Sequence, residues 1–97
     1  MPRSRTEVQR AAGKLTSAIQ KVWGEELGEA GAKVSEEALH ISHTILQACS
    51  AGSLNQALAG RTISEFIGQT WVHRHRGVQA AIRVLEAAIV EEQRAHA

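Results

Sequence analysis

The chain has no aspartate and no tyrosine, and it has one cysteine and one proline among 97 residues. Catalytic triads and magnesium sites that are built on aspartate are therefore excluded. A single cysteine excludes an internal disulfide and a zinc cage made of several cysteines of one chain. The aromatic residues are two tryptophans and one phenylalanine, so the core has to be built from aliphatic side chains.

The length and composition predict one globular domain over residues 1–97. Two separate cores would each fall well below the usual domain size of roughly 100–150 residues. The uncharged stretch 38–60 is too polar for a membrane span, which needs roughly 20 mostly apolar residues, and the chain does not open with a signal-peptide pattern. We therefore expect a cytoplasmic protein, in keeping with the free Cys49. The excess of arginine over lysine favours a bacterial or phage gene.

The charges are grouped in blocks, although the net charge is only +1. Residues 1–14 and 61–85 are basic, whereas residues 15–37 and 86–97 are acidic. Such blocks favour a polar partner surface or a self-complementary one.

Apolar residues recur at spacings of three and four, which predicts helices throughout. A first helix runs from a capping box at Ser4–Glu7 to Gly28, and a second from Ser35 to Gly52. A capping box at Ser53 opens a short helix that ends at Gly60, and a third box at Thr62–Glu65 opens the last helix.

The end of the chain permits two interpretations. The cationic residues 73–76 followed by Gly77 are typical of a helix C-terminus. The apolar register nevertheless continues from Ile67 to Ala88, so we favour one helix over residues 63–94. That helix would be about 48 Å long, more than a lone domain of this size easily covers, which favours a dimer. The predicted fold is all-α, a small helical bundle of four main helices with the last one long or kinked at Gly77.

The basic segment 73–76 is the most unusual local feature. Its arginines are suited to phosphate contacts and a neighbouring tryptophan to base stacking. The simpler interpretation is that the tryptophan anchors the core and the cations are solvated or paired with an acidic block. The candidate nucleic-acid or partner-binding residues are Arg61, Trp71, His73, Arg74, His75, Arg76 and Arg83.

A metal site is a weaker candidate. His40 and His43 lie one helical turn apart, Glu36 continues the same stripe, and Glu37 to His40 has the Glu-x-x-His spacing of di-iron bundles. The chain holds no second copy of that motif, so only a symmetric dimer would complete such a site. The alternative is that the stripe is the solvent-facing side of the helix. Cys49 similarly fits a small buried hydrophobe better than a nucleophile.

Together these features predict a non-enzymatic protein–protein interaction module without a cofactor. We expect a homo-oligomer, with a dimer favoured, that docks another protein in an accessory or regulatory role. The first alternative is a nucleic-acid-binding regulator that uses the basic segment 73–76, and the second is a metal-binding bundle.

Overall fold

The computed structural model describes residues 7–95, and all regular structure within them is helical. The prediction of an all-α bundle is therefore confirmed. No helix among the described residues is long and apolar enough to cross a membrane. The helices are α1 (Glu7–Glu25), α2 (Ala32–Ala51), α3 (Leu54–Leu58), α4 (Ile63–Ile67), α5 (Gln69–His73) and α6 (Arg76–Ala95).

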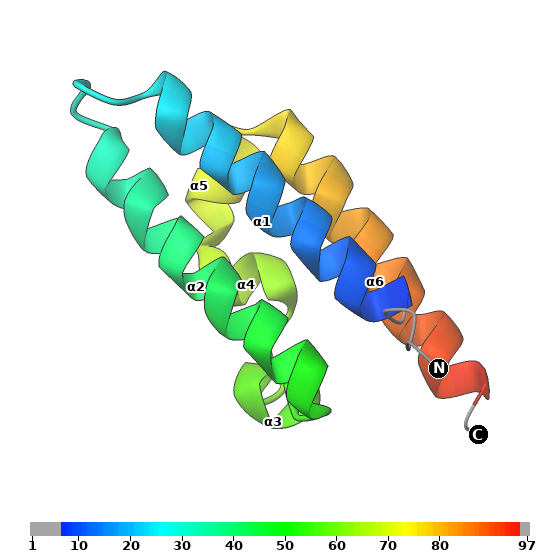
Figure 1. Cartoon of the computed structure of the whole chain (residues 1–97). Coiled ribbons are helices and arrows are strands. Elements are labelled where there is room, and N and C mark those ends of the chain that lie inside the picture. The colour runs from blue at the N-terminus through cyan, green and yellow to red at the C-terminus, as the bar shows by residue number, and fades with distance from the viewer. Residues whose placement is uncertain (1–6, 96–97) are drawn as a thin grey trace, which may run out of the picture.

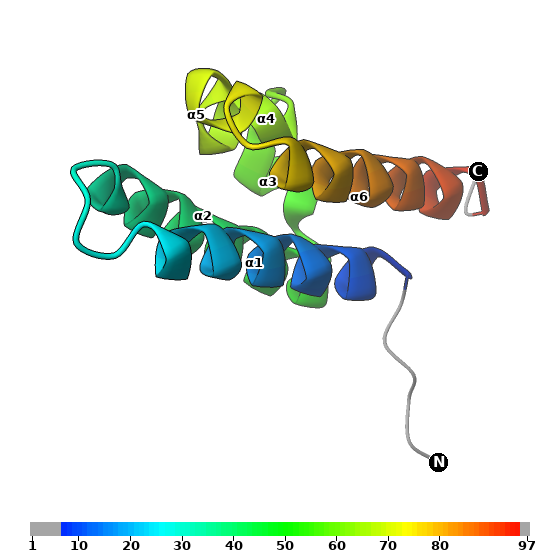
Figure 2. The same ribbon diagram turned by 90° about the horizontal axis from the view of Figure 1, so that it is seen from above.

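The three long helices form the frame of the bundle. Helix α1 packs against both α2 and α6, and the short helix α4 contacts both α2 and α6 as well. The start of α1 and the end of α6 lie at the same end of the molecule, so these two helices are antiparallel (Figures 1 and 2). As a result, Arg10 and Lys14 of α1 line one cleft together with Glu91 of α6.

The core is aliphatic, as the shortage of aromatic residues predicts. Each long helix contributes fully buried side chains at helical spacing, and the start of α4 adds one more. The largest of them are Leu15, Ile19, Ile45, Ile63, Val78 and Leu85.

The structure confirms one of the predicted N-terminal helix caps and contradicts two. The capping box at Thr62 is confirmed, because Thr62 Oγ1 accepts from the amide of Glu65 at 3.1 Å and Glu65 Oε1 accepts from the amide of Thr62 at 2.8 Å. The box at Ser53 is wrong: Ser53 precedes α3 but makes no side-chain cap bond. Ser4 of the first box lies outside the described residues. The start at Ser35 is also wrong, since α2 begins at Ala32 and Ser35 is buried within it.

The single helix expected over residues 63–94 is wrong, and three helices take its place. Gly68 separates α4 from α5 with φ of 128° and ψ of 101°, a conformation that is open to glycine because it has no Cβ. After α5, the carbonyl of His75 accepts from the amides of Val78 and Gln79 and so starts a new helix. Gly77 consequently lies in the first turn of α6 and is neither a kink nor a turn. The four expected main helices become three long and three short ones among the described residues, so helix length no longer favours a dimer.

Candidate functional site

A polar cluster joins the loop after α1 to α2, α5 and the segment before α6. It consists of Glu26, Ser35, Trp71 and His75. Ser35 donates a hydrogen bond to Oε1 of Glu26 and accepts one from the indole nitrogen of Trp71 at 3.0 Å. The hydroxyl of Ser35 is thus satisfied as donor and acceptor, although the residue is completely buried.

His75 closes the cluster from the other side. Its Nδ1 lies 2.8 Å from the carbonyl oxygen of Trp71, and its Nε2 lies 3.4 Å from Oε2 of Glu26. The imidazole also packs on the indole, with ring centroids 4.5 Å apart. Each ring nitrogen thus has an oxygen atom of another residue as its polar neighbour.

The order of contacts shows what this cluster can do chemically. In a nucleophilic triad the histidine takes the proton of the hydroxyl and the carboxylate orients the histidine. Here Glu26 lies between Ser35 and His75, and the hydroxyl gives its hydrogen bond to the carboxylate. The order of contacts is therefore not that of a Ser-His-carboxylate triad, and the completely buried hydroxyl of Ser35 ties segments of the chain together.

A cleft of about 600 Å³ opens beside the cluster, between the loop after α1 and helix α5. We call it the Trp71 cleft. Its apolar lining comes from Val34, Ile67 and Trp71, and its ionisable lining comes from Glu26, Arg74 and His75. Three of the predicted partner-binding residues, Trp71, Arg74 and His75, therefore meet in one place.

The remaining predicted cations lie elsewhere. His73 and Arg83 line a different, smaller cleft together with Glu86. The guanidinium of Arg61 lies 5.0 Å from the ring centroid of Phe66, and Arg76 is exposed at the start of α6.

Trp71 is not placed for stacking on a base. Its side chain is only 8% exposed, one ring face packs on His75, and its nitrogen is bonded to Ser35. The tryptophan has the core-anchor position of the simpler interpretation, and nucleic-acid binding would depend on the exposed cations alone.

The candidate metal ligands lie on the outer face of α2. Glu36, His40 and His43 are all exposed. Within the described part of the chain, no group of three or more histidine, cysteine or acidic side chains is placed to hold a metal ion.

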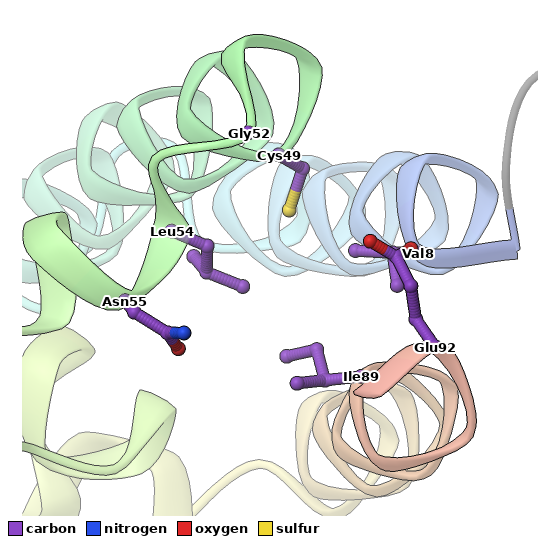
Figure 3. Close-up of a pocket in the computed structure, with 7 residues that line it drawn as sticks. All are labelled: Val8, Cys49, Gly52, Leu54, Asn55, Ile89 and Glu92. Carbon is purple, nitrogen blue, oxygen red and sulfur yellow. The ribbon is translucent and has the colours of Figure 1, made fainter. Parts of the chain in front are cut away.

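Cys49 points into a pocket of about 110 Å³ at the end of the bundle where α1 starts (Figure 3). Val8, Leu54 and Ile89 supply apolar walls, and Glu92 lies at its rim. Burial, with a smaller contribution from the negative charge of Glu92, raises the pKa of the Cys49 thiol to about 11. A thiol with so high a pKa is a poor nucleophile at neutral pH, because the thiolate is the reactive form.

Sequence reasoning missed Glu26 and Ser35. A signal for Ser35 was present, because Ser35, Ala38, Ser42 and Ile45 recur at spacings of three and four and share the buried face of α2. Glu26 lies in the loop after α1, where no periodicity marks the direction of a side chain.

No model of a protein family, no curated protein and no solved structure matches this chain. Its function is therefore inferred from its own residues.

Proposed function

We propose that the chain is a non-enzymatic protein–protein interaction module that forms a homodimer through the outward face of α6. We also propose that it acts in the cytoplasm, in an accessory or regulatory role of a bacterium or phage. One observation carries the dimer: α6 has a second apolar stripe opposite the one that fills the core.

The inner and outer stripes of α6 have the same spacing. The inner stripe packs in the core, and its residues are Val78, Ile82, Leu85 and Ile89. The outer stripe faces away from the bundle with alternating steps of three and four, the spacing of a helix–helix contact. Its residues are Gly77, Ala80, Val84 and Ala87, all of them exposed, and the charged Glu91 ends it.

The outer stripe is suited to another helix at close range. Val84 is 53% exposed at its centre, and the small residues Ala80 and Ala87 flank it by about one helical turn on either side. Small side chains shorten the distance at which two helix axes can pack. Val84, Ala87 and Ala88 also line a cleft between α1 and α6, whose charged lining residues are Glu7, Arg10, Lys14 and Glu91.

Charge complementarity supports a second copy as the occupant. Helix α6 carries Arg76 and Arg83 in its first half and Glu86, Glu91, Glu92 and Arg94 in its second, where Arg94 lies 3.5 Å from Glu91 in an exposed ion pair. In an antiparallel pair related by a two-fold axis at Val84, Gly77 of one copy lies opposite Glu91 of the other, so Arg76 lies one residue away from that carboxylate. The same contact occurs twice in such a dimer, as two-fold symmetry requires, and antiparallel helix dipoles add a favourable interaction.

Light scattering after size-exclusion chromatography tests this proposal. We expect a mass twice the 10.5 kDa of one chain. The Val84→Glu variant is expected to run as a monomer, because two carboxylates would face each other at the two-fold axis. Val90→Glu is the matched control: Val90 is 50% exposed on the same helix but lies about 120° around the axis from Val84, so its variant should remain dimeric.

Charge reversal tests the predicted pairing. Arg76→Glu and Glu91→Arg should each weaken the dimer, and the double variant should recover it. A wild-type monomer at concentrations of about 500 μM, where even a weak interface of small area would assemble, overturns the proposal. A dimer that persists in the Val84→Glu variant assigns the interface to another face.

Nucleic-acid binding remains the alternative proposal. Arg74, Arg76 and Arg83 are exposed and make no ion pair with another described residue. Absorbance at 260 and 280 nm on the same column would reveal bound nucleic acid. Binding that is lost in the Arg74→Ala, Arg76→Ala double variant and weakens steeply with salt would favour this alternative.

A further inference from the structure

The Trp71 cleft is a candidate binding site that is separate from the outer stripe of α6. The residues that line it come from the loop after α1, the start of α2, and the segment from α4 to His75. Its volume of about 600 Å³ lies within the range of roughly 300–1,000 Å³ that is typical of small-molecule sites.

One wall of the cleft is apolar and open. Val34 is 51% exposed although it is a large aliphatic side chain. Ile67 and Trp71 are buried residues that present a small part of their surface to the same cleft. A ligand that covered this wall would remove apolar surface from water, which is favourable.

The two oppositely charged residues of the cleft, Glu26 and Arg74, differ in how they are paired. Both carboxylate oxygens of Glu26 already have a polar neighbour: the Ser35 hydroxyl donates to one oxygen, and Nε2 of His75 lies 3.4 Å from the other. The guanidinium of Arg74, by contrast, makes no hydrogen bond or ion pair with any described residue. The group left to bind a ligand is therefore cationic, and guanidinium groups bind carboxylates through paired hydrogen bonds.

We propose that the Trp71 cleft binds a small organic anion, a carboxylate with an aromatic or branched aliphatic body. The carboxylate contacts Arg74, and the apolar body lies against Val34, Ile67 and the edge of Trp71. The exposed side chains of Gln69 and Thr70 line the same cleft and add polar groups that favour a ligand with one charged end.

The two tryptophans make this proposal directly measurable. In a nitrogen–proton correlation spectrum each tryptophan gives one indole signal; Trp71 lines the cleft and Trp23 does not. Phenylbutyrate is a suitable probe because it joins an aromatic ring to a carboxylate. With about a dozen heavy atoms, it is expected to bind with a dissociation constant on the order of 1 mM.

We expect phenylbutyrate to change the chemical shift of the Trp71 indole signal until the change saturates with rising concentration. The Trp23 signal should stay in place. The neutral amide of the same compound should bind several-fold more weakly, because it lacks the charge that pairs with Arg74. No saturable shift of Trp71 up to about 10 mM, or equal shifts of both indole signals, overturns the site. Equal affinity for the acid and the amide overturns its assignment to an anion.

Two exposed side chains allow variants that leave the core intact. Arg74→Gln should weaken phenylbutyrate binding about threefold, the usual scale for an exposed ion pair, while Arg83→Gln in the separate cleft serves as the matched control. Val34→Ser should weaken the acid and the amide alike. If Arg74→Gln and Arg83→Gln bind phenylbutyrate as the wild type does, Arg74 is not the anion contact and the proposal fails.

Discussion

The indole nitrogen of Trp71 donates a hydrogen bond of 3.0 Å to the buried hydroxyl of Ser35. The two residues are 36 positions apart in the chain, and their contact joins α5 to α2. Ser35 donates in turn to Glu26, which also contacts His75. A single hydroxyl therefore connects the loop after α1, helix α2 and the wall of the Trp71 cleft.

The Ser35→Ala variant is expected to lower the free energy of unfolding by about 1–3 kcal/mol. The substitution leaves the indole nitrogen of Trp71 buried without an acceptor, and an unpaired buried polar group costs about that much. Chemical denaturation followed by circular dichroism measures the change.

Ser50→Ala is the matched control, because Ser50 is exposed on the same helix. Both variants replace a helical serine with alanine, so they share the same change in helix propensity. A Ser35→Ala protein as stable as the Ser50→Ala protein would show that the hydrogen bond to Trp71 does not contribute.

Ser35 also illustrates where sequence reasoning succeeds and fails. The helical periodicity of α1, α2 and α6 predicts the all-α class and the aliphatic core, because burial of one apolar face leaves a regular pattern. A serine before two glutamates has the same appearance whether it caps a helix or lies within one. Which of the two occurs depends on whether a distant residue, here Trp71, forms a hydrogen bond with the serine. No local sequence pattern shows that.

The break at Gly68 shows a second limit. The register from Ile67 to Ala88 is continuous, so periodicity favours an unbroken helix. The folded chain instead turns at Gly68 and brings Trp71 and Val72 into the core. Tertiary burial outweighs local helix continuity there. In the candidate site, Trp71, Arg74 and His75 were predicted from an unusual local run, whereas Glu26 depends on a loop whose path the sequence does not reveal.

The capping box before α4 should contribute measurably to stability. Thr62→Ala removes the oxygen that accepts from the amide of Glu65, and loss of such a cap costs about 1 kcal/mol. Ser53→Ala is the matched control, since Ser53 occupies the same position before α3 without a side-chain cap bond. Equal denaturation midpoints for the two variants would argue against a contribution from the Thr62 cap.

Glu65 should make part of this stability depend on pH. The backbone amide of Thr62, then its side chain, and finally the charge of Arg61 lower the pKa of Glu65 from its ordinary value of 4.5. A group with a lowered pKa in the folded state stabilises the fold above its ordinary pKa, and this contribution disappears as pH falls through the folded value. We therefore expect the stability difference between the wild type and Glu65→Gln to shrink as pH is lowered below about 4.5.

Denaturation of the two proteins between neutral pH and pH 3 measures that difference. In a Thr62→Ala background the pH dependence due to Glu65 should decrease only in part, because the backbone amide of residue 62, the larger cause of the lowered pKa, is retained. A difference that stays constant over the whole range would contradict the contribution of the carboxylate.

Cys49 should react slowly with alkylating agents while the protein is folded. Burial first, and then the charge of Glu92, raises the pKa of Cys49 from 9.0 to about 11. Near pH 8 the thiolate fraction is then about 100-fold lower than in the unfolded chain, and alkylation by iodoacetamide, followed by mass spectrometry, should slow by a similar factor.

The Glu92→Gln variant should raise the alkylation rate, but by less than unfolding does, because burial is the larger cause. Glu36→Gln changes the same charge on the exposed outer face of α2 and should leave the rate unchanged. Equal rates in the folded and unfolded wild type would show that the pocket in Figure 3 does not shield the thiol.

The conformation of Gly68 predicts opposite effects for two glycine-to-alanine substitutions. A Cβ at Gly68 meets no atom within 4 Å, but φ of 128° is unfavourable for any other residue, and such strain costs on the order of 1–3 kcal/mol. Gly24 lies in α1, where a Cβ would also meet no atom within 4 Å and the backbone does not have a positive φ. Gly24→Ala should therefore stabilise the protein by up to about 1 kcal/mol, whereas Gly68→Ala should destabilise it.

Thermal and chemical denaturation of both variants tests the pair. Alanine favours a helix over the turn, so Gly68→Ala also favours the continuous helix over residues 63–94 that the apolar register predicts. If Gly68→Ala stabilises the protein as Gly24→Ala does, the chain does not need the turn at Gly68, and the packing of α5 against α2 through Trp71 and Ser35 would have to be revised.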